Sequence, residues 1–302
     1  MPNRGFVFAT TGPEYTALAQ RAALSVKQYC PDIPIDLFTD QALTDTTFSR
    51  IHKLESSWFR PKMESLYRSR FAKTVYLDSD LLVIADIRDM FDMLGRFDIA
   101  ATHDQYRNSP LATRIYTHAI PAAFPQYNGG VLGFSRSDKT KTFLKNWEQA
   151  LKDSNAKRDQ PIFRELLFDS SLSICTLPPE YNAHRIEPLR VLTSDDCAPR
   201  VIHHYNFHQH IGRGHYPINT VQELLGTRLY NHVQMLITAD SSLNPDGEHP
   251  KVSAFCDIHP GKTVPTPYRI KSAADFRQKL KTPFRGTYGE SWYKTIKQWF
   301  TS

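Results

Sequence analysis

Short apolar runs alternate with segments of helical periodicity over the first hundred residues, and this rhythm constrains the fold more than any other feature of the chain. Strand-like runs cover 5–10, 35–39 and 74–77, and segments with helical spacing cover 15–29 and 61–71. Strands separated by helices are typical of a mostly parallel sheet whose faces are covered by helices. We therefore expect an α/β fold.

The same pattern of expected strands and helices extends along the chain, and a change in the sequence pattern near residue 216 suggests a domain boundary. Further strands are expected at 51–54, 97–101, 130–134, 173–177 and 201–202, and further helices at 137–152 and 160–168. A helix over 221–236 is followed by a polar stretch that contains Pro and Gly. With 302 residues, the chain suits one large α/β domain over 1–216 and a partly helical extension over 217–302.

Composition narrows the class of protein. No stretch approaches the roughly 18 apolar residues that a spanning helix needs. The apolar run at 6–9 is too short for a signal peptide. The four cysteines lie far apart without a Cys-x-x-Cys pair, which disfavours a zinc ribbon and a dense disulfide framework. We expect a soluble, cytoplasmic protein.

The chain is basic, with a formal net charge of +6 and a pI near 9.0. Such a balance attracts anions, among them nucleic acids, anionic lipids and phosphorylated substrates. The basic residues are scattered, with no run of five or more, and no basic helix or stacking platform is visible. We therefore expect no nucleic-acid partner.

Two carboxylates, Asp78 and Asp80, follow the strand at 74–77 with only Ser79 between them. Ligands of open α/β sheets bind beyond the carboxyl ends of the strands, and two carboxylates there can hold a divalent cation. Other interpretations are open: the pair can cap a turn or form salt bridges. A phosphatase of the haloacid-dehalogenase type also carries Asp-x-Asp, but Gly-Thr normally follows it and Leu-Leu follows here.

With its flanks, the segment 71–91 (FAKTVYLDSDLLVIADIRDMF) resembles the core of family 8 glycosyltransferases, the group of glycogenin and the lipopolysaccharide galactosyltransferases. Four further segments match the family in the same order. The resemblance covers about residues 5–215. It implies a GT-A fold, which is a Rossmann-like, mixed and mostly parallel sheet. It also implies a nucleotide-diphosphate sugar donor, expected to be UDP-linked, held with Mn²⁺ or Mg²⁺.

One of these segments, together with Lys62, is expected to bind the donor. The segment 9–15 (ATTGPEY) resembles the family loop that holds the nucleobase and ribose, which assigns donor contacts to its residues Ala9, Thr10, Thr11 and Tyr15. Lys62 matches a basic residue that the family places near the donor. The alternatives are a turn with a packed tyrosine for the first segment and a solvated helix face for Lys62.

Two more segments are expected to bind the sugar. Asn128, Gly129 and Gly130 resemble the family's Asn-Ala-Gly segment, with Gly129 in place of the usual alanine. Asn128 carries both a donor and an acceptor for sugar hydroxyls. Asp159 and Gln160 match a pair that contacts the donor sugar and lies near its reacting carbon. A hairpin or bulge at 128–130, and a helix N-cap at Asp159, are the structural alternatives.

The fourth matching segment, 178–182 (PPEYN), resembles a Leu-Pro-x-x-Tyr-Asn stretch of the family, and we expect it to be structural. Five of the twelve histidines then crowd into positions 203–215. The family completes its metal site with a histidine after two apolar residues. His203 fits that spacing, and His204 fits if the following aromatic residue is the anchor. We prefer His203.

The chain departs from the family after this histidine, because a Lys-Pro-Trp segment that contacts the diphosphate is replaced. Arg213 is the expected substitute for its positive charge. The three outer histidines form either a solvated polar loop or a separate zinc site. They are His208, His210 and His215.

These observations predict a metal-dependent glycosyltransferase with a glycan or lipid-linked glycan acceptor, and the family implies retention of anomeric configuration. The alternative is a non-catalytic protein of the same fold that binds a nucleotide or glycan. Aromatic residues at near-helical spacing over 292–300, with lysines between them, favour a helix. That helix either packs on the protein or a second subunit, or contacts a membrane interface.

Overall fold

The computed structural model describes residues 3–55, 60–109, 114–154, 156–211 and 217–255. Met1–Phe255 form one compact unit. The predicted helix over 292–300, Arg213 and His215 lie outside the described residues.

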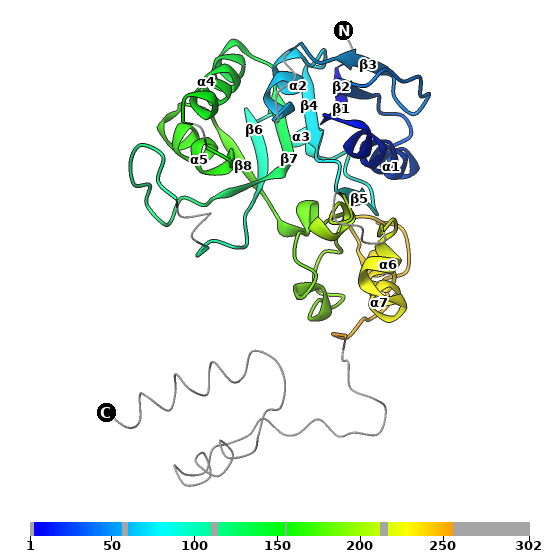
Figure 1. Ribbon diagram of the computed structural model, residues 1–302. Helices are drawn as coiled ribbons and strands as arrows, with labels where there is room; N and C mark the ends of the chain where they lie inside the picture. The colour runs from blue at the N-terminus through cyan, green and yellow to red at the C-terminus, as the bar shows by residue number, and fades with distance from the viewer. Residues whose placement is uncertain (1–2, 56–59, 110–113, 155, 212–216, 256–302) are drawn as a thin grey trace, which may run out of the picture. The chain divides into compact units, whose positions relative to one another are not determined.

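A seven-stranded sheet with the order β3-β2-β1-β4-β7-β6-β8 forms the centre of this unit (Figure 1). Every neighbouring pair is parallel except those made by β7, which runs antiparallel to β4 and β6. This confirms the expected mixed, mostly parallel sheet. The strands are β1 (Arg4–Thr10), β2 (Ile35–Thr39), β3 (Arg50–Lys53), β4 (Lys73–Leu77), β6 (Ile99–His103), β7 (Tyr127–Ser135) and β8 (Ile174–Leu177).

Helices cover both faces of the sheet, because nearly every residue of its central strands is apolar and buried. In β1, Phe6 and Phe8 point into one core with α1, and Val7 points into a second core with α4 and α5. Figure 1 shows α1 on one side of the sheet and α4 and α5 on the other. The helices are α1 (Pro13–Tyr29), α2 (Lys62–Arg68), α3 (Met90–Met93), α4 (Asp138–Ser154) and α5 (Gln160–Asp169).

A second, two-stranded sheet joins segments that are far apart in the sequence. Strand β5 (Leu81–Val83) pairs antiparallel with β9 (Val201–His203), and Leu81 lies opposite His203. The sequence did not predict β5, since three residues are too few for a period to show. Three short 3-10 turns flank β9 in the chain: η1 (Pro179–Asn182), η2 (Pro188–Arg190) and η3 (Tyr205–Phe207).

The single helix expected over 221–236 is wrong in detail. It is two helices, α6 (Val221–Leu225) and α7 (Thr227–Ala239), which separate at Gly226. Gly226 has φ of 74°, a backbone conformation that interrupts the helix and that residues with a Cβ rarely adopt. Both helices pack on Leu82 and Ile202 in one apolar cluster. The domain boundary near residue 216 stays a prediction.

The connection between β6 and β7 is held in place by two side chains of α5. The buried carboxylate of Glu165 accepts hydrogen bonds from the backbone N–H groups of Tyr116 and of Thr117, the latter at 2.7 Å. Arg164 donates through Nε to the carbonyl of Phe124 at 3.0 Å. The described part of this connection that follows residue 113 is thereby fixed on the helix.

We expect Glu165→Gln to loosen this loop and destabilise the protein by about 2 kcal/mol at neutral pH, because bonds to a charged acceptor are lost. Burial raises the pKa of Glu165, but the hydrogen bonds from Tyr116 and Thr117 outweigh burial and lower it. The ionised form is therefore the stabilising one. The stability difference between wild type and variant should shrink as the pH falls below the ordinary glutamate pKa. Denaturant unfolding at several pH values measures this, and a difference independent of pH would contradict it.

Candidate active site

A cavity of about 660 Å³ opens at the edge where β1 and β4 end and β7 begins. Parallel strands β1 and β4 bring their carboxyl ends to this edge, and the antiparallel β7 brings its amino end. Nearly all of the predicted site residues meet here. Those that line the cavity are Ala9, Thr10, Thr11, Tyr15, Lys62, Asp78, Ser79, Asp80, Asn128, Gly129, Asp159, Gln160 and His203.

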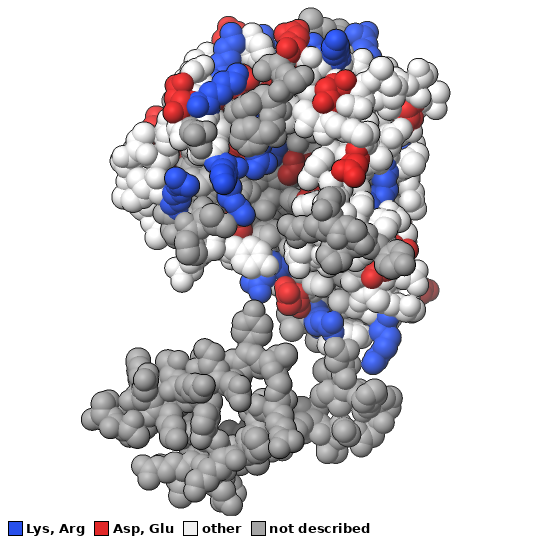
Figure 2. Space-filling view, viewed as in Figure 1, with Lys and Arg blue, Asp and Glu red and all other residues white. Residues whose placement is uncertain are grey.

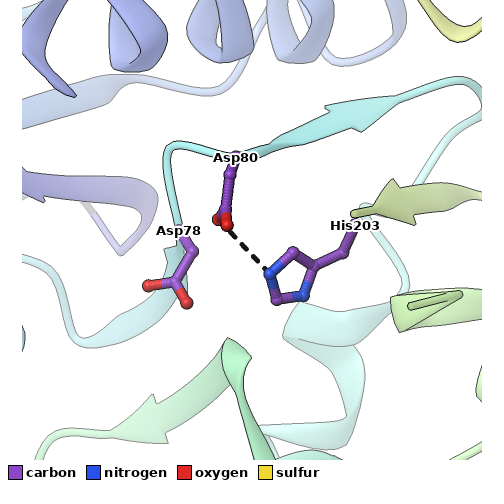
Figure 3. A group of neighbouring side chains, drawn as sticks. All are labelled: Asp78, Asp80 and His203. Carbon is purple, nitrogen blue, oxygen red and sulfur yellow. Dashed lines mark ion pairs between the residues drawn. The ribbon is translucent and has the colours of Figure 1, made fainter. Parts of the chain in front are cut away.

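Asp78, Asp80 and His203 form a group whose ligand atoms all lie within 4.8 Å of one another (Figure 3). The pairing of β5 with β9 explains this. It sets His203 opposite Leu81, and His203 Nε2 then lies 3.3 Å from Asp80 Oδ1. His204 points elsewhere, and its Nδ1 accepts a hydrogen bond from the Asn206 N–H. Of the two candidate histidines, His203 is therefore the one beside both carboxylates.

A chain of hydrogen bonds sets the orientation of the His203 ring. The Gly130 N–H donates to Asn128 Oδ1, which also accepts from Asn182 Nδ2. Asn182 Oδ1 is then left to face His203 Nδ1 at 2.9 Å. Because this oxygen can only accept, His203 Nδ1 must carry the proton and Nε2 is turned to the carboxylates.

This chain of bonds changes two expectations. Asn128 was predicted to offer both an acceptor and a donor to the sugar, but two internal donors already occupy its Oδ1. Of the prediction for Asn128, only the hydrogen-bond donor, the side-chain Nδ2, remains. Asn182, which was expected to be structural, orients the candidate metal ligand. Sequence matching located its segment, but only the fold shows what it touches.

Lys62 is buried between two carboxylates. Its Nζ donates to the Gly129 carbonyl at 2.6 Å and lies 3.4 Å from Asp78 Oδ1 and 3.6 Å from Asp159 Oδ2. The side chain is 7% exposed. A buried ammonium group in this position balances negative charge in the wall of the cavity. The solvated-face interpretation of Lys62 is wrong.

Asp159 is 4% exposed, and its Oδ2 receives no hydrogen bond. The residue stands at the N-cap position of α5, but its side chain makes no capping bond. Burial raises the pKa of Asp159, yet the charges of Lys62 and Arg60 outweigh burial and lower it. The result is an ionised carboxylate in the wall of the cavity, with its Oδ2 buried beside Lys62.

His208, which the sequence assigned to a solvated loop or to a separate zinc site, lines the cavity beside Asp80. Its Nδ1 donates to Asp80 Oδ2 at 2.7 Å. Burial raises the pKa of Asp80, but His203 and His208 outweigh burial and hold it far below its usual range. Within the described part of the chain no second group of metal-ligating side chains is found, so the separate zinc site has no support there. The crowding of histidines was the available signal.

Two contacts shape the end of the cavity that Thr10 and Tyr15 line. Tyr15 is 40% exposed, and its ring centroid lies 6.2 Å from that of His208. The hydroxyl of Thr10 is bonded to that of Thr16 at 3.0 Å, which turns it inward. Tyr15 therefore presents an aromatic surface to the cavity, whereas Thr10 contributes mainly backbone.

The model of the nucleotide-diphospho-sugar transferase family matches residues 17–212, more than half of the chain. The chain belongs to this family. It is therefore a glycosyltransferase, as the sequence predicted. No curated protein sequence is significantly similar to it.

Solved structures show the same fold at low sequence identity. An active-site mutant of LgtC, a galactosyltransferase, superimposes with a TM-score of 0.51 and 19% identity, over 75% of this transferase and 95% of LgtC. The glycosyltransferase GlyE of Streptococcus pneumoniae TIGR4 gives a TM-score of 0.52 and 18% identity, over 77% of this chain and 60% of GlyE. These similarities establish the GT-A-like fold.

No helix among the described residues of the transferase is long and apolar enough to cross a membrane.

Gly130 is required by a close approach to the candidate metal ligand. A Cβ on Gly130 would lie 2.2 Å from Cε1 of His203, inside the ring's contact distance. A Cβ on the neighbouring Gly129 would lie 2.9 Å from Lys62 Nζ, which is the far end of a flexible side chain. An alanine at Gly129 is thus tolerable, and one at Gly130 is not.

We expect Gly130→Ala to displace His203 and weaken Mn²⁺ binding by about tenfold or more, the usual effect of misplacing a ligand's support. Gly129→Ala is the matched control and should weaken binding much less. Titration of Mn²⁺ by electron paramagnetic resonance measures both, and circular dichroism checks the fold. Equal affinities in the two variants would contradict the geometry.

Proposed function

We propose that the protein transfers a sugar from a nucleotide-diphosphate donor, UDP-linked, to a hydroxyl group of a glycan. The proposal includes Mn²⁺, with Mg²⁺ as the substitute, held by Asp78, Asp80 and His203. One observation carries it: the two carboxylates and the imidazole line the same cavity as the segment 9–15 and Asp159. A nucleotide, a metal and a sugar hydroxyl would all find partners within that cavity.

The donor set suits the metal. Two carboxylates and one neutral imidazole are ligands that Mn²⁺ accepts, and three protein ligands leave positions for diphosphate oxygens. The hydrogen bond from His203 to Asn182 supports the ligand from behind. When bound, the metal supplies Lewis-acid stabilisation of the departing diphosphate.

The chain's own residues position the donor. In this proposal Tyr15 stacks on the nucleobase, and the backbone of 9–11 contacts the base and ribose. Asp159 accepts a hydrogen bond from a sugar hydroxyl, and its ionised state favours that bond. The family resemblance assigns Gln160 to the neighbourhood of the reacting carbon. It also implies retention of configuration, which brings the acceptor to the face that the diphosphate leaves.

We expect Asp80→Ala to abolish metal-dependent turnover while the protein stays folded, because both a metal ligand and the partner of His208 are removed. The control is Asp246→Ala, which removes an exposed carboxylate outside the cavity. Release of nucleoside diphosphate from the donor measures turnover, and thermal unfolding checks the fold. Wild-type turnover in Asp80→Ala would refute the assignment.

A screen of UDP-, GDP- and other nucleotide-sugars, with and without Mn²⁺, identifies the donor. We expect a metal-dependent rise of Tm with UDP-linked sugars, together with release of UDP. Binding without release would favour the alternative of a non-catalytic nucleotide- or glycan-binding protein. No response to any donor, with or without metal, would contradict the proposed transfer and would favour a repurposed binding protein of the same fold.

Three further predictions accompany this proposal. Arg213 is expected to contact the diphosphate, the protein is expected in the cytoplasm, and the segment 292–300 either packs on protein or contacts a membrane. A lipid-linked acceptor would follow from the last of these.

A further inference from the structure

A second cavity, of about 450 Å³, adjoins the donor cavity and shares Lys157 and Arg158 with it. Its other walls come from the end of α4, the first turn of α5 and the loop before β7, where Arg114 lies. Figure 2 shows several Lys and Arg side chains gathered on this face, near the position that α5 has in Figure 1.

The second cavity lies at the sugar end of the donor cavity. The ends of β1 and β4 and the start of β7 follow one another along the sheet edge and carry, in turn, Thr10, Asp78 and Asn128. Asp159 comes next, joined through Lys62 to Asp78. Lys157 and Arg158 immediately precede Asp159 in the chain. A donor whose base lies at the β1 end therefore presents its sugar, and not its diphosphate, to these cations.

All charged residues among the described lining of the second cavity are positive. Its described lining residues include Arg114, Lys157 and Arg158 and no aspartate or glutamate. None of the three cations forms an ion pair with another side chain in the described part of the chain. By contrast, Lys62 in the donor cavity is matched by two carboxylates. Burial raises the pKa of Asp104, but contacts that include the charge of Arg158 outweigh burial and lower it. Three cations that form no ion pair around one hollow still attract an anion.

Hydrogen bonds hold the walls of this cavity in place. Glu165 fixes the backbone of Tyr116, and the Tyr116 hydroxyl donates to the Ala150 carbonyl at 3.3 Å. Arg60 donates to the Lys157 carbonyl at 3.0 Å. Ile115 adds an exposed apolar surface of the kind on which the C–H face of a sugar packs. The cavity thus offers a saccharide an apolar wall and a cationic rim.

We infer that the acceptor is an anionic saccharide, which carries a carboxylate or phosphate close to the hydroxyl group that receives the sugar. The inference rests on the proposed function, since it assigns the second cavity to the acceptor. Arg114 and Arg158 bind the anionic group, and the hydroxyl is directed at the donor sugar beside Asp159.

The test measures binding of three probes to the full-length protein by isothermal titration calorimetry, with and without UDP and Mn²⁺. Methyl glucuronide tests a carboxylate, glucose phosphate tests a phosphate, and methyl glucoside is the neutral reference. Arg114→Gln is the chief variant, since Arg114 lines only the second cavity. Lys139→Gln on α4 removes the same charge from an exposed site elsewhere and is the control.

We expect at least one anionic probe to bind wild type about tenfold more tightly than the neutral one, the scale of one charge-assisted hydrogen bond. Arg114→Gln should remove most of that preference and leave UDP affinity unchanged, and Lys139→Gln should keep both. Which anionic probe binds identifies carboxylate or phosphate. Equal binding of all probes, or a preference that survives Arg114→Gln, overturns the inference.

Two outcomes separate this inference from the proposed function. A large loss of UDP affinity in Arg114→Gln would place the donor phosphates in the second cavity and overturn the anionic acceptor. Failure of wild type to bind UDP with Mn²⁺ would contradict the proposed donor, while the probe preference measured without UDP still decides whether the second cavity binds anionic saccharides.

Discussion

One buried ammonium group makes the candidate active site possible. Lys62 stands between Asp78 and Asp159 and beneath the Gly129 carbonyl. Without it, two carboxylates at the edge of an apolar core would repel each other and lack compensation. With it, both carboxylates face a compensating positive charge in the wall of the cavity. One belongs to the proposed metal site and the other is proposed to bind the sugar.

The candidate metal site also requires that Asp80 and His203 lie side by side, and strand pairing achieves this. Asp80 and His203 are separated by more than a hundred residues, and the antiparallel pairing of β5 with β9 brings them together. The two strands are held by the apolar cluster that α6 and α7 complete. Helices α6 and α7 thereby support the candidate metal site without contributing a side chain to it. Their packing and the chemistry at the cavity are parts of one arrangement.

Much of this was predictable from the sequence. The alternation of strands and helices predicted the sheet, since buried parallel strands are apolar throughout and their helices carry the 3.6-residue period. The motif order located the residues that line the cavity. Other features left no such signal. The bond of His208 to Asp80, the position of Asn182 behind His203 and the break at Gly226 depend on tertiary contacts or a single dihedral angle.

The sequence by itself determined which chemistry was available: paired carboxylates after a strand, a histidine after two apolar residues and a glycine pair next to an asparagine. The tertiary structure decided which polar groups are occupied by contacts within the protein and which line a cavity. Lys62 and the Oδ1 acceptor of Asn128 are occupied by internal contacts. Arg114, Lys157 and Arg158 line a second cavity and form no ion pair among the described residues. The physical reason is that charge balance and hydrogen bonding depend on neighbours in space, which the order of residues does not reveal.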